Sequence, residues 1–530
     1  MNIQLYDTSL RDGSQRAGIS FSVEDKLKIA RRLDELGIHF IEGGWPGSNP
    51  KDVEFFLRAR ELNLIHATLV AFGSTRRANT KAATDPNLQA LMKAGTRAVT
   101  LVGKSWDLHV TEVLETTLEE NLQMISDSIL YLKEKVPTVF LDAEHFFDGY
   151  KGNKKYALRT IEVGAEAGAD CIVLCDTNGG ALPQEIATAV EAARKIGIAL
   201  GIHTHNDGEL AVANTLAAVQ AGVTQVQGTI NGYGERCGNA NLCSIIPTLK
   251  LKMDIDCIRE ENLAKLTEVA RYISELANLS HDPHLPYVGA SAFTHKGGLH
   301  ISGMIKHWES YQHINPDLVG NSSGVLVSEL SGASAIIYKA KELGLDIPKG
   351  ERARVVLEQI KTLENQGFQY EGAEASLELL IRRSQPAYQP PFELVDFMVV
   401  IEKHRRIPTV VAQEELLAEA MVKIRVGGQV IHTAAEGNGP VNALDAALRK
   451  ALLQFYPSLA VVRLMDYKVR ILEESQGTES RVRVLMESSD GGHGWHTMGS
   501  STNIIEASWI ALADSLEYWL LRRGVAAPRT

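Results

Sequence analysis

Short apolar runs rich in β-branched residues recur along the first 235 positions of the chain. They alternate with longer segments whose apolar residues recur every three or four positions. The first pattern predicts buried β-strands, and the second predicts amphipathic helices. Strands that alternate with helices at a spacing of roughly 30 residues predict parallel βα units. The eight predicted strands are residues 3–9, 39–45, 66–73, 98–105, 138–146, 171–179, 199–207 and 225–235.

The number of predicted strands favours a closed barrel over an open sheet. Eight consecutive βα units match the (β/α)8 TIM barrel. The alternative, a doubly wound sheet, would have a phosphate-binding GxGxxG turn after an early strand, and the sequence has none there. We therefore expect an α/β fold in which residues 1–257 form a TIM barrel. In such a barrel the active site lies at the C-terminal ends of the strands.

The pattern changes after the predicted barrel. Residues 258–392 have helical periodicity interrupted by loops, and residues 385–393 contain three prolines, which is typical of a linker. We therefore expect a helical linker region between the barrel and a last domain that covers residues 393–530.

The last domain contains an internal repeat. Residues 421–452 match a second copy that begins at Arg481 and ends at residue 516. Each copy has strand patterns, a glycine turn, the dipeptide HT and a helix pattern. Two such copies can pack around a pseudo-twofold axis, so we expect a C-terminal α+β domain.

Composition and charge exclude some classes of protein. The chain has 530 residues, is 45% hydrophobic and 22% charged, and carries a formal net charge of −11. We expect no nucleic-acid partner and no membrane partner, since the chain is acidic and no run of about 18 apolar residues could span a bilayer. The start of the chain shows no signal-peptide pattern, and the five cysteines form no CxxC pair. We therefore expect reduced thiols in a cytoplasmic protein.

The stretch GIHTHND, residues 201–207, places two histidines in the seventh predicted strand. Residues two apart on a strand share a face, so His203 and His205 can both point at the barrel axis. Asp12 follows the first strand, and Asn239 follows the eighth. One Asp, two His and an amide oxygen form a mixed set that leaves coordination positions open for a substrate, unlike a closed structural zinc site. The alternative is that one histidine packs and the other forms hydrogen bonds.

Three motifs resemble those of a known enzyme family. DTSLRDGSQ, HTHND and GERCGNANL are similar to motifs of the 2-isopropylmalate synthase, homocitrate synthase and citramalate synthase family, and the similarity covers the whole chain. The stretches EGGWPGSNPKD, FGSTRR, GKSWDLHVTE and DAEHFFDGYKGN look most like the citramalate synthase branch. Members of this family are metal-dependent enzymes that join acetyl-CoA to a 2-oxo acid in a Claisen condensation. The resemblance to this branch implies pyruvate as the acceptor.

The resemblance implies roles for residues of the barrel. Arg11 would stabilise the alkoxide that develops on the 2-oxo group. Thr177 would bind the substrate carboxylate, and Glu144 would lie near the acetyl-CoA end. Asp12 would contact the substrate as well as the metal. The implied metal ligands are Asp12, His203, His205 and Asn239.

The resemblance also implies roles for the rest of the chain. In KGGLHISG, His300 matches a histidine implicated in deprotonating the acetyl methyl group, and Tyr311 matches a tyrosine near it. The linker region would lie over the partner's barrel in a homodimer, so that both residues act across the dimer. The last domain would be regulatory and bind an end-product amino acid, which for this branch would be isoleucine. The alternative is a domain that only dimerises.

Every implied site residue also has a purely structural alternative. Arg11 and Asp12 could form only a surface ion pair, Glu144 could only orient Arg11, and Thr177 could cap a helix. His300 could be only solvated, Tyr311 could only pack, and Asn239 could be a loop residue.

The sequence leaves the metal and the acceptor open. Two imidazoles favour Mn, Co or Zn, and Mg stays in the set. A sister synthase would use 2-oxoisovalerate, as 2-isopropylmalate synthase does, or 2-oxoglutarate. A methyl group and an isopropyl group on the acceptor differ only modestly in binding. Acyl-CoA lyase or aldolase chemistry is another alternative, but a lyase would not need the long C-terminal repeat. The last alternative is a ligand-sensing protein without enzymatic activity. The intact set of Arg11, Asp12, His203 and His205 argues against it.

Overall fold

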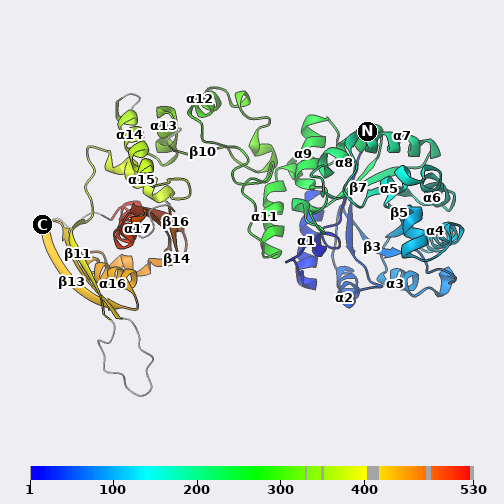
Figure 1. Ribbon diagram of the computed structural model, residues 1–530, viewed down its shortest axis with the longest axis horizontal. Coiled ribbons are helices and arrows are strands. Elements are labelled where there is room, and N and C mark those ends of the chain that lie inside the picture. The colour runs from blue at the N-terminus through cyan, green and yellow to red at the C-terminus, as the bar shows by residue number, and fades with distance from the viewer. Residues whose placement is uncertain are drawn as a thin grey trace, which may run out of the picture. The chain divides into compact units, whose positions relative to one another are not determined.

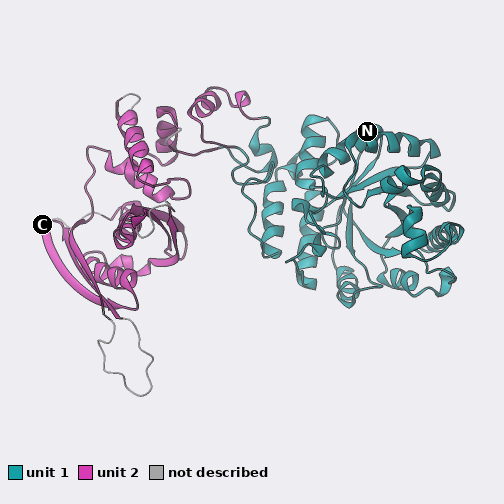
Figure 2. Cartoon of the chain, in the orientation of Figure 1, with its two compact units in different colours: residues 1–293, 313–323 teal, residues 294–312, 324–530 magenta. Residues whose placement is uncertain are grey.

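The computed structural model of the chain describes residues 2–328, 331–345, 347, 351–402, 417–472 and 479–525. The chain divides into two compact units, coloured separately in Figure 2. Unit 1 consists of residues 1–293 and 313–323, and unit 2 consists of residues 294–312 and 324–530. Among the helices in these described ranges, none combines the length and the apolarity needed to cross a membrane.

Unit 1 is a closed barrel of eight parallel strands in sequence order (Figure 1). Each strand pairs with the next, and the barrel closes where β1 pairs with β8, Asp7 lying opposite Gly228. The predicted (β/α)8 fold is confirmed, and the doubly wound alternative is wrong. The strands are β1 Gln4–Asp7, β2 Phe40–Gly44, β3 Thr68–Ser74, β4 Ala98–Lys104, β5 Thr138–Glu144, β6 Cys171–Asp176, β7 Leu200–Thr204 and β8 Gln225–Gly228.

Helices surround the barrel and carry the chain from one strand to the next (Figure 1). Their ends follow local sequence signals. For example, α1 begins with a capping box between Ser22 and Asp25 and ends at Gly37, whose φ of 93° suits glycine. The helices are α1 Val23–Leu36, α2 Pro50–Ala59, α3 Pro86–Ala94, α4 Leu118–Lys133, α5 Phe146–Gly152, α6 Lys154–Glu166, α7 Pro183–Ala193, α8 Ala211–Ala221, α9 Leu242–Lys252, α10 Glu260–Leu263 and α11 Leu266–Leu276.

Seven of the eight predicted strands run past the observed strands at the C-terminal end of the barrel, whereas β3 runs one residue past its prediction. The eighth prediction covers residues 225–235, but β8 ends at Gly228, and Ile230–Gly232 form a 3-10 turn. In this turn Asn231 has a φ of 62°, which a strand does not allow. The polar residues that follow each strand therefore belong to loops, and these loops build the site.

The inside of the barrel holds an apolar cluster and several buried polar side chains. On β5, Phe140 and Asp142 lie on the same face of the strand. The hydroxyl of Tyr6 donates to Oε2 of Glu42 at 2.7 Å and lies 2.8 Å from Oγ1 of Thr100. The apolar cluster contains the ring of Tyr6 together with Val70, Ala98, Phe140, Cys171, Val173 and Cys175.

The first part of unit 2 is helical. Its helices share a core that includes Ile301, Ile336, Val356 and Leu377. The helical periodicity within residues 258–392 includes the segments that form α14 and α15. The elements are β9 Thr294–His295, α12 Gly298–Lys306, β10 Gly324–Val325, α13 Ala333–Glu342, α14 Glu351–Asn365 and α15 Glu374–Arg383.

The second part of unit 2 contains the predicted repeat, and the described residues of each copy form three antiparallel strands and one helix. The two copies share one core, to which Leu444, Val484, Trp495 and Leu516 belong. The first copy is β11 Glu393–Glu402, β12 Leu417–Val426, β13 Gln429–Gly437 and α16 Pro440–Leu452. The second copy is β14 Arg463–Ile471, β15 Val482–Ser489, β16 Gly494–Ser501 and α17 Ile504–Arg522.

The two copies agree in detail. In the HT dipeptides, Oγ1 of Thr433 donates to the carbonyl of Ala447, and Oγ1 of Thr497 donates to the carbonyl of Ala511, both at 2.7 Å. Each bond ties the third strand of a copy to its helix. The pairing of the first two strands also shifts register at the same place, after Leu394 in one copy and after Leu464 in the other. The repeat therefore includes a first strand that the predicted copies leave out.

Candidate active site

A cavity of about 570 Å³ opens at the C-terminal ends of the barrel strands. The predicted site residues in its wall come from the ends of β1, β5, β6 and β7 and from the loops that follow them. These segments are far apart in the sequence, but the fold brings them together at one end of the barrel. Six of the nine predicted site residues line the cavity: Arg11, Asp12, Glu144, Thr177, His203 and His205.

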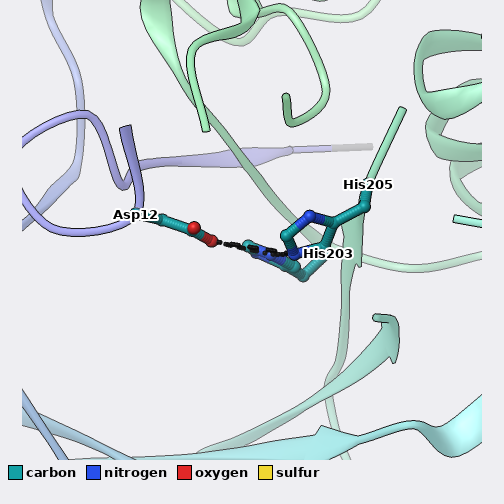
Figure 3. Close-up of side chains that lie close together, drawn as sticks. All are labelled: Asp12, His203 and His205. Carbon is teal, nitrogen blue, oxygen red and sulfur yellow. Dashed lines mark hydrogen bonds and ion pairs between the residues drawn. The ribbon is translucent and has the colours of Figure 1, made fainter. Parts of the chain in front are cut away.

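Asp12, His203 and His205 form a compact group of ligand atoms (Figure 3). Nε2 of His203 lies 3.3 Å from Oδ2 of Asp12 and 3.3 Å from Nε2 of His205. Nε2 of His205 lies 3.9 Å from the same oxygen of Asp12. All three side chains are buried. One carboxylate oxygen and two imidazole nitrogens at these separations can hold one divalent cation.

Burial and neighbouring charges set the protonation of this group. Burial and the charge of His203 lower the pKa of His205 to about 4, so this ring is neutral at neutral pH. Burial alone would raise the pKa of Asp12, but Arg11 and the two histidines hold this pKa below its usual range. Burial alone would lower the pKa of His203, but the hydrogen bond and the charge of Asp12 raise it. A cation at this site would compete with the proton of His203. The affinity of the site for the cation therefore falls as the pH is lowered.

Asn239 lies at the edge of the same group. Its Nδ2 donates to Oδ2 of Asp12 at 2.8 Å and lies 3.5 Å from Nε2 of His203. Within the described ranges its Oδ1 is buried and has no hydrogen-bond partner. Turning the amide by 180° exchanges the two atoms and brings Oδ1 to the other ligand atoms. The unpartnered oxygen therefore fits the predicted fourth ligand.

Arg11 is held by two contacts that the sequence does not reveal. Its Nε donates to Oε1 of Glu42 at 2.5 Å, and its guanidinium carbon lies 3.9 Å from the ring centre of Phe72. Its Nη1 lies 3.7 Å from Oδ2 of Asp12. Glu42 is a site residue that our sequence reasoning missed, and its signal was its place at the end of the second strand pattern, in EGGWP. The guanidinium fork is thus oriented at the cavity wall before any substrate binds.

Glu144 lies at the end of β5 and is about one quarter exposed, with 23% of its side chain accessible. Its carboxylate pairs with Nζ of Lys104 at the end of β4. The carboxylate that orients Arg11 is therefore Glu42, whereas Glu144 presents a lysine-paired carboxylate to the cavity.

Thr177 follows β6, and its Oγ1 accepts the backbone N–H of His145 at 2.9 Å. Because the hydroxyl already accepts one bond, its own proton can be donated to a carboxylate in the cavity. Helix α7 has Leu182 as its N-cap, so Thr177 does not cap it. The carbonyl of Thr177 accepts a bond of 2.7 Å from Arg236, a second residue that we missed, which also forms two hydrogen bonds to Asp207.

His300 and Tyr311 belong to unit 2, whereas the cavity is built by unit 1. His300 lies on α12, and Tyr311 follows a 3-10 turn at Trp308–Ser310. Their rings stack, with centroids 4.4 Å apart and an interplanar angle of 28°. Both residues are exposed. The structure therefore brings these two predicted residues together, as an accessible pair on unit 2.

Three family models match the chain. The HMGL-like family matches residues 2–273, which contain the barrel and its cavity. The family described as homocitrate synthase post-HMGL domain-like matches residues 287–367. The LeuA allosteric (dimerisation) domain matches residues 371–520, which contain the first copy of the repeat and all of the second except the last two residues of α17.

The chain is also similar to complete proteins. It is 55% identical over 520 residues to the (R)-citramalate synthase of Geobacter sulfurreducens, covering 98% of this chain and 97% of that protein. It is 53% identical over 528 residues to the (R)-citramalate synthase of Aquifex aeolicus, covering 98% of each. A probable 2-isopropylmalate synthase of Methanopyrus kandleri is 30% identical over 526 residues, covering 98% of this chain and 99% of that protein. The chain belongs to the (R)-citramalate synthase family.

Proposed function

We propose that this enzyme condenses acetyl-CoA with pyruvate and hydrolyses the thioester, giving (R)-citramalate and CoA. The observation that carries the proposal is the convergence of Arg11, Asp12, His203 and His205 on one cavity. Relatives named (R)-citramalate synthase match this chain over almost its whole length, which supports pyruvate as the acceptor. The chemical difficulty is that the methyl group of a thioester is a very weak acid. The carbanion must therefore form next to its electrophile.

The proposed cofactor is a divalent cation bound by Asp12, His203 and His205, with Asn239 as the fourth side chain. The mixed nitrogen and oxygen donors favour Mn, Co or Zn, with Mg in the set. When bound, the cation supplies a Lewis acid for the ketone of the 2-oxo acid.

Residues of the barrel bind and orient the acceptor. Arg11 donates N–H groups to the ketone oxygen, which becomes an alkoxide as the carbon–carbon bond forms. Its contacts with Glu42 and Phe72 fix the fork in advance, so little reorganisation accompanies the reaction. The hydroxyl of Thr177 donates to the carboxylate of the acceptor.

His300 is the proposed base for the acetyl methyl proton, with Tyr311 beside it. Imidazole side chains commonly serve as general bases in enzymes. The stacked and exposed pair, together with the match to a dimerisation domain, supports action on the partner's barrel in a homodimer. There Glu144 of the barrel would lie near the acetyl-CoA end. The enolate carbon then attacks C2 of pyruvate, and water cleaves the thioester.

For the C-terminal domain we propose feedback by isoleucine. The support is the match of residues 371–520 to the LeuA allosteric (dimerisation) domain and the paired copies of the repeat. Feedback requires an effector that binds two conformations with different affinity. The proposed division of labour is catalysis by residues 1–257, a helical linker at 258–392 and regulation by residues 393–530. The five free cysteines support a cytoplasmic location.

CoA release tests the proposed reaction. The enzyme is given acetyl-CoA and one of pyruvate, 2-oxobutyrate, 2-oxoisovalerate or 2-oxoglutarate, with Mn²⁺ or Mg²⁺, and the free thiol is measured with a thiol reagent. We expect a clear preference for pyruvate and loss of activity in EDTA. A preference for 2-oxoisovalerate would instead assign 2-isopropylmalate synthesis. No release with any acceptor would favour the lyase or the ligand-sensing alternative.

A further inference from the structure

We call Asp12, His203 and His205 the ligand group. From it, three side chains form a hydrogen-bonded row across the inside of the barrel. Nδ1 of His203 lies 3.0 Å from Oε1 of Gln227, and Nε2 of Gln227 donates to Oδ1 of Asp142 at 3.2 Å. Gln227 is fully buried, and Asp142 is 4% exposed. The three residues come from β7, β8 and β5. The row is therefore held by the barrel itself and not by a loop.

The direction of these bonds follows from which atoms can donate. Oδ1 of Asp142 is an acceptor, so the amide nitrogen of Gln227 lies on its side. Burial and the charge of Glu42 raise the pKa of Asp142 to about 7, but a proton on Oδ2 leaves Oδ1 an acceptor. The amide oxygen of Gln227 then faces His203, and an oxygen of this kind only accepts. Nδ1 of His203 must therefore carry the ring proton.

The consequence concerns the other nitrogen of the ring. A neutral imidazole with its proton on Nδ1 has its lone pair on Nε2. This is the atom of His203 that lies 3.3 Å from Oδ2 of Asp12, inside the ligand group. We propose that Gln227 is a positioning residue that, oriented by Asp142, holds His203 in the tautomer that presents Nε2 to the divalent cation. The inference rests on the proposed metal site and adds the device that prepares one of its ligands.

Gln225 provides a matched control. It lies two positions earlier on β8, faces the same side of the strand and is equally buried. In the part of the chain that the structure describes, neither its amide nitrogen nor its amide oxygen has a hydrogen-bond partner. Gln225→Met therefore removes the same polar atoms as Gln227→Met without removing a bond to His203.

The test measures metal binding to the full-length chain without substrates. Chelator-treated protein is titrated with Mn²⁺, and the free ion is followed by its EPR signal. Loss of a partner to a metal-binding histidine typically costs about 10- to 100-fold in affinity, so Gln227→Met should weaken binding by this factor. Gln225→Met should bind as the unchanged chain does.

A double variant tests the bonding scheme. Asp142→Asn with Gln227→Glu exchanges the carboxylate and the amide. The carboxylate at position 227 then accepts a hydrogen bond from Nδ1 of His203. The amide at position 142 donates a hydrogen bond to the same carboxylate. Affinity for Mn²⁺ should return to within about threefold of the unchanged chain, which a loss of barrel packing would not allow.

Three results would overturn the proposal. They are unchanged affinity in Gln227→Met, an equal loss in Gln225→Met, and a double variant that binds as weakly as Gln227→Met. If Gln227→Met does not fold, the double variant decides alone, and a loss of tenfold or more counts against the proposal. Failure of the metal site itself gives a different result, because the unchanged chain would then bind no Mn²⁺ or bind it equally well after His203→Ala.

Discussion

Arg11 lies between the carboxylate of Glu42 and the ring of Phe72, and these contacts leave its fork one orientation. Lysine carries a single donating nitrogen on a flexible stem, so Arg11→Lys loses either the ion pair or the bond to the substrate. We expect kcat to fall about 100-fold, the usual effect of removing one donor to an oxyanion. CoA release at saturating pyruvate measures this. Arg159→Lys, on the exposed side of α6, is the control, and equal kcat in both variants would contradict the role of Arg11.

His203 contributes the most central atom of the ligand group, since its Nε2 lies 3.3 Å from both other ligand atoms. His203→Ala should abolish both Mn²⁺ binding and metal-dependent turnover, because it removes one of the two imidazole ligands of the proposed set. Mn²⁺ titration and CoA release measure the two effects. The exposed His66→Ala serves as the control. Full turnover by the His203→Ala enzyme would contradict the proposed metal site.

Asp7 is a fully buried carboxyl group at the end of β1. Burial raises its pKa to about 7, although hydrogen bonds from Ser9 oppose this rise. Between about pH 4 and pH 7 the folded chain holds a proton that the unfolded chain has released, so stability falls as the pH rises through this window. Asp7→Asn should remove that fall and raise Tm above pH 7, with little change near pH 4. Thermal unfolding from pH 4 to pH 9 measures this, and parallel curves for the two proteins would contradict it.

At the scale of helices and strands, the sequence predicts the features that have a local signal. Alternation of apolar runs and amphipathic segments predicts the eight strands and the barrel, and the paired HT dipeptides predict the repeat. The pairing of Arg11 with Glu42 has no such local signal. It joins the loop after β1 to β2, and these two elements approach each other only in the closed sheet. The same holds for Gln227, whose role depends on neighbours from β5 and β7.

The first strand of each repeat copy shows the same limit. β11 and β14 share the pattern Leu-x-Asp-aromatic, at Leu394 and Leu464, which is too short to align with certainty. Their equivalence becomes visible in the register shift that both strands share.

The equivalent threonines of the two copies offer a test of the elements they join. Thr497→Val keeps the shape of the side chain and removes the bond to Ala511, so we expect a loss of about 1 kcal/mol in the free energy of unfolding. Thr433→Val should cost less, because Thr433 is only half-buried while Thr497 is fully buried. Denaturant unfolding measures both, with the exposed helix position Thr362→Val as the control. A larger loss at position 433 would contradict this argument from burial.

At the scale of the whole molecule, the two compact units predict two separable responses to heat. A ligand that binds only the folded state stabilises it by about 2.7 kcal/mol at a concentration of 100 times Kd. Because the ligand group lies in unit 1, EDTA should lower the unfolding temperature of that unit and leave the transition of unit 2 in place. Scanning calorimetry with EDTA and after Mn²⁺ is restored measures this. In His203→Ala, EDTA and Mn²⁺ should leave the unfolding temperature of unit 1 unchanged. A change there would show that the cation binds at another site.

The bond between Asn239 and Asp12 joins residues 227 positions apart. Asp12 follows β1, Asn239 follows β8, and the two strands meet where the barrel closes. During synthesis, therefore, the first of the proposed ligands leaves the ribosome long before the others. Contacts of such long sequence separation form late in folding. If these side chains hold the proposed cation, the site for it is complete only once the last strand has closed the barrel.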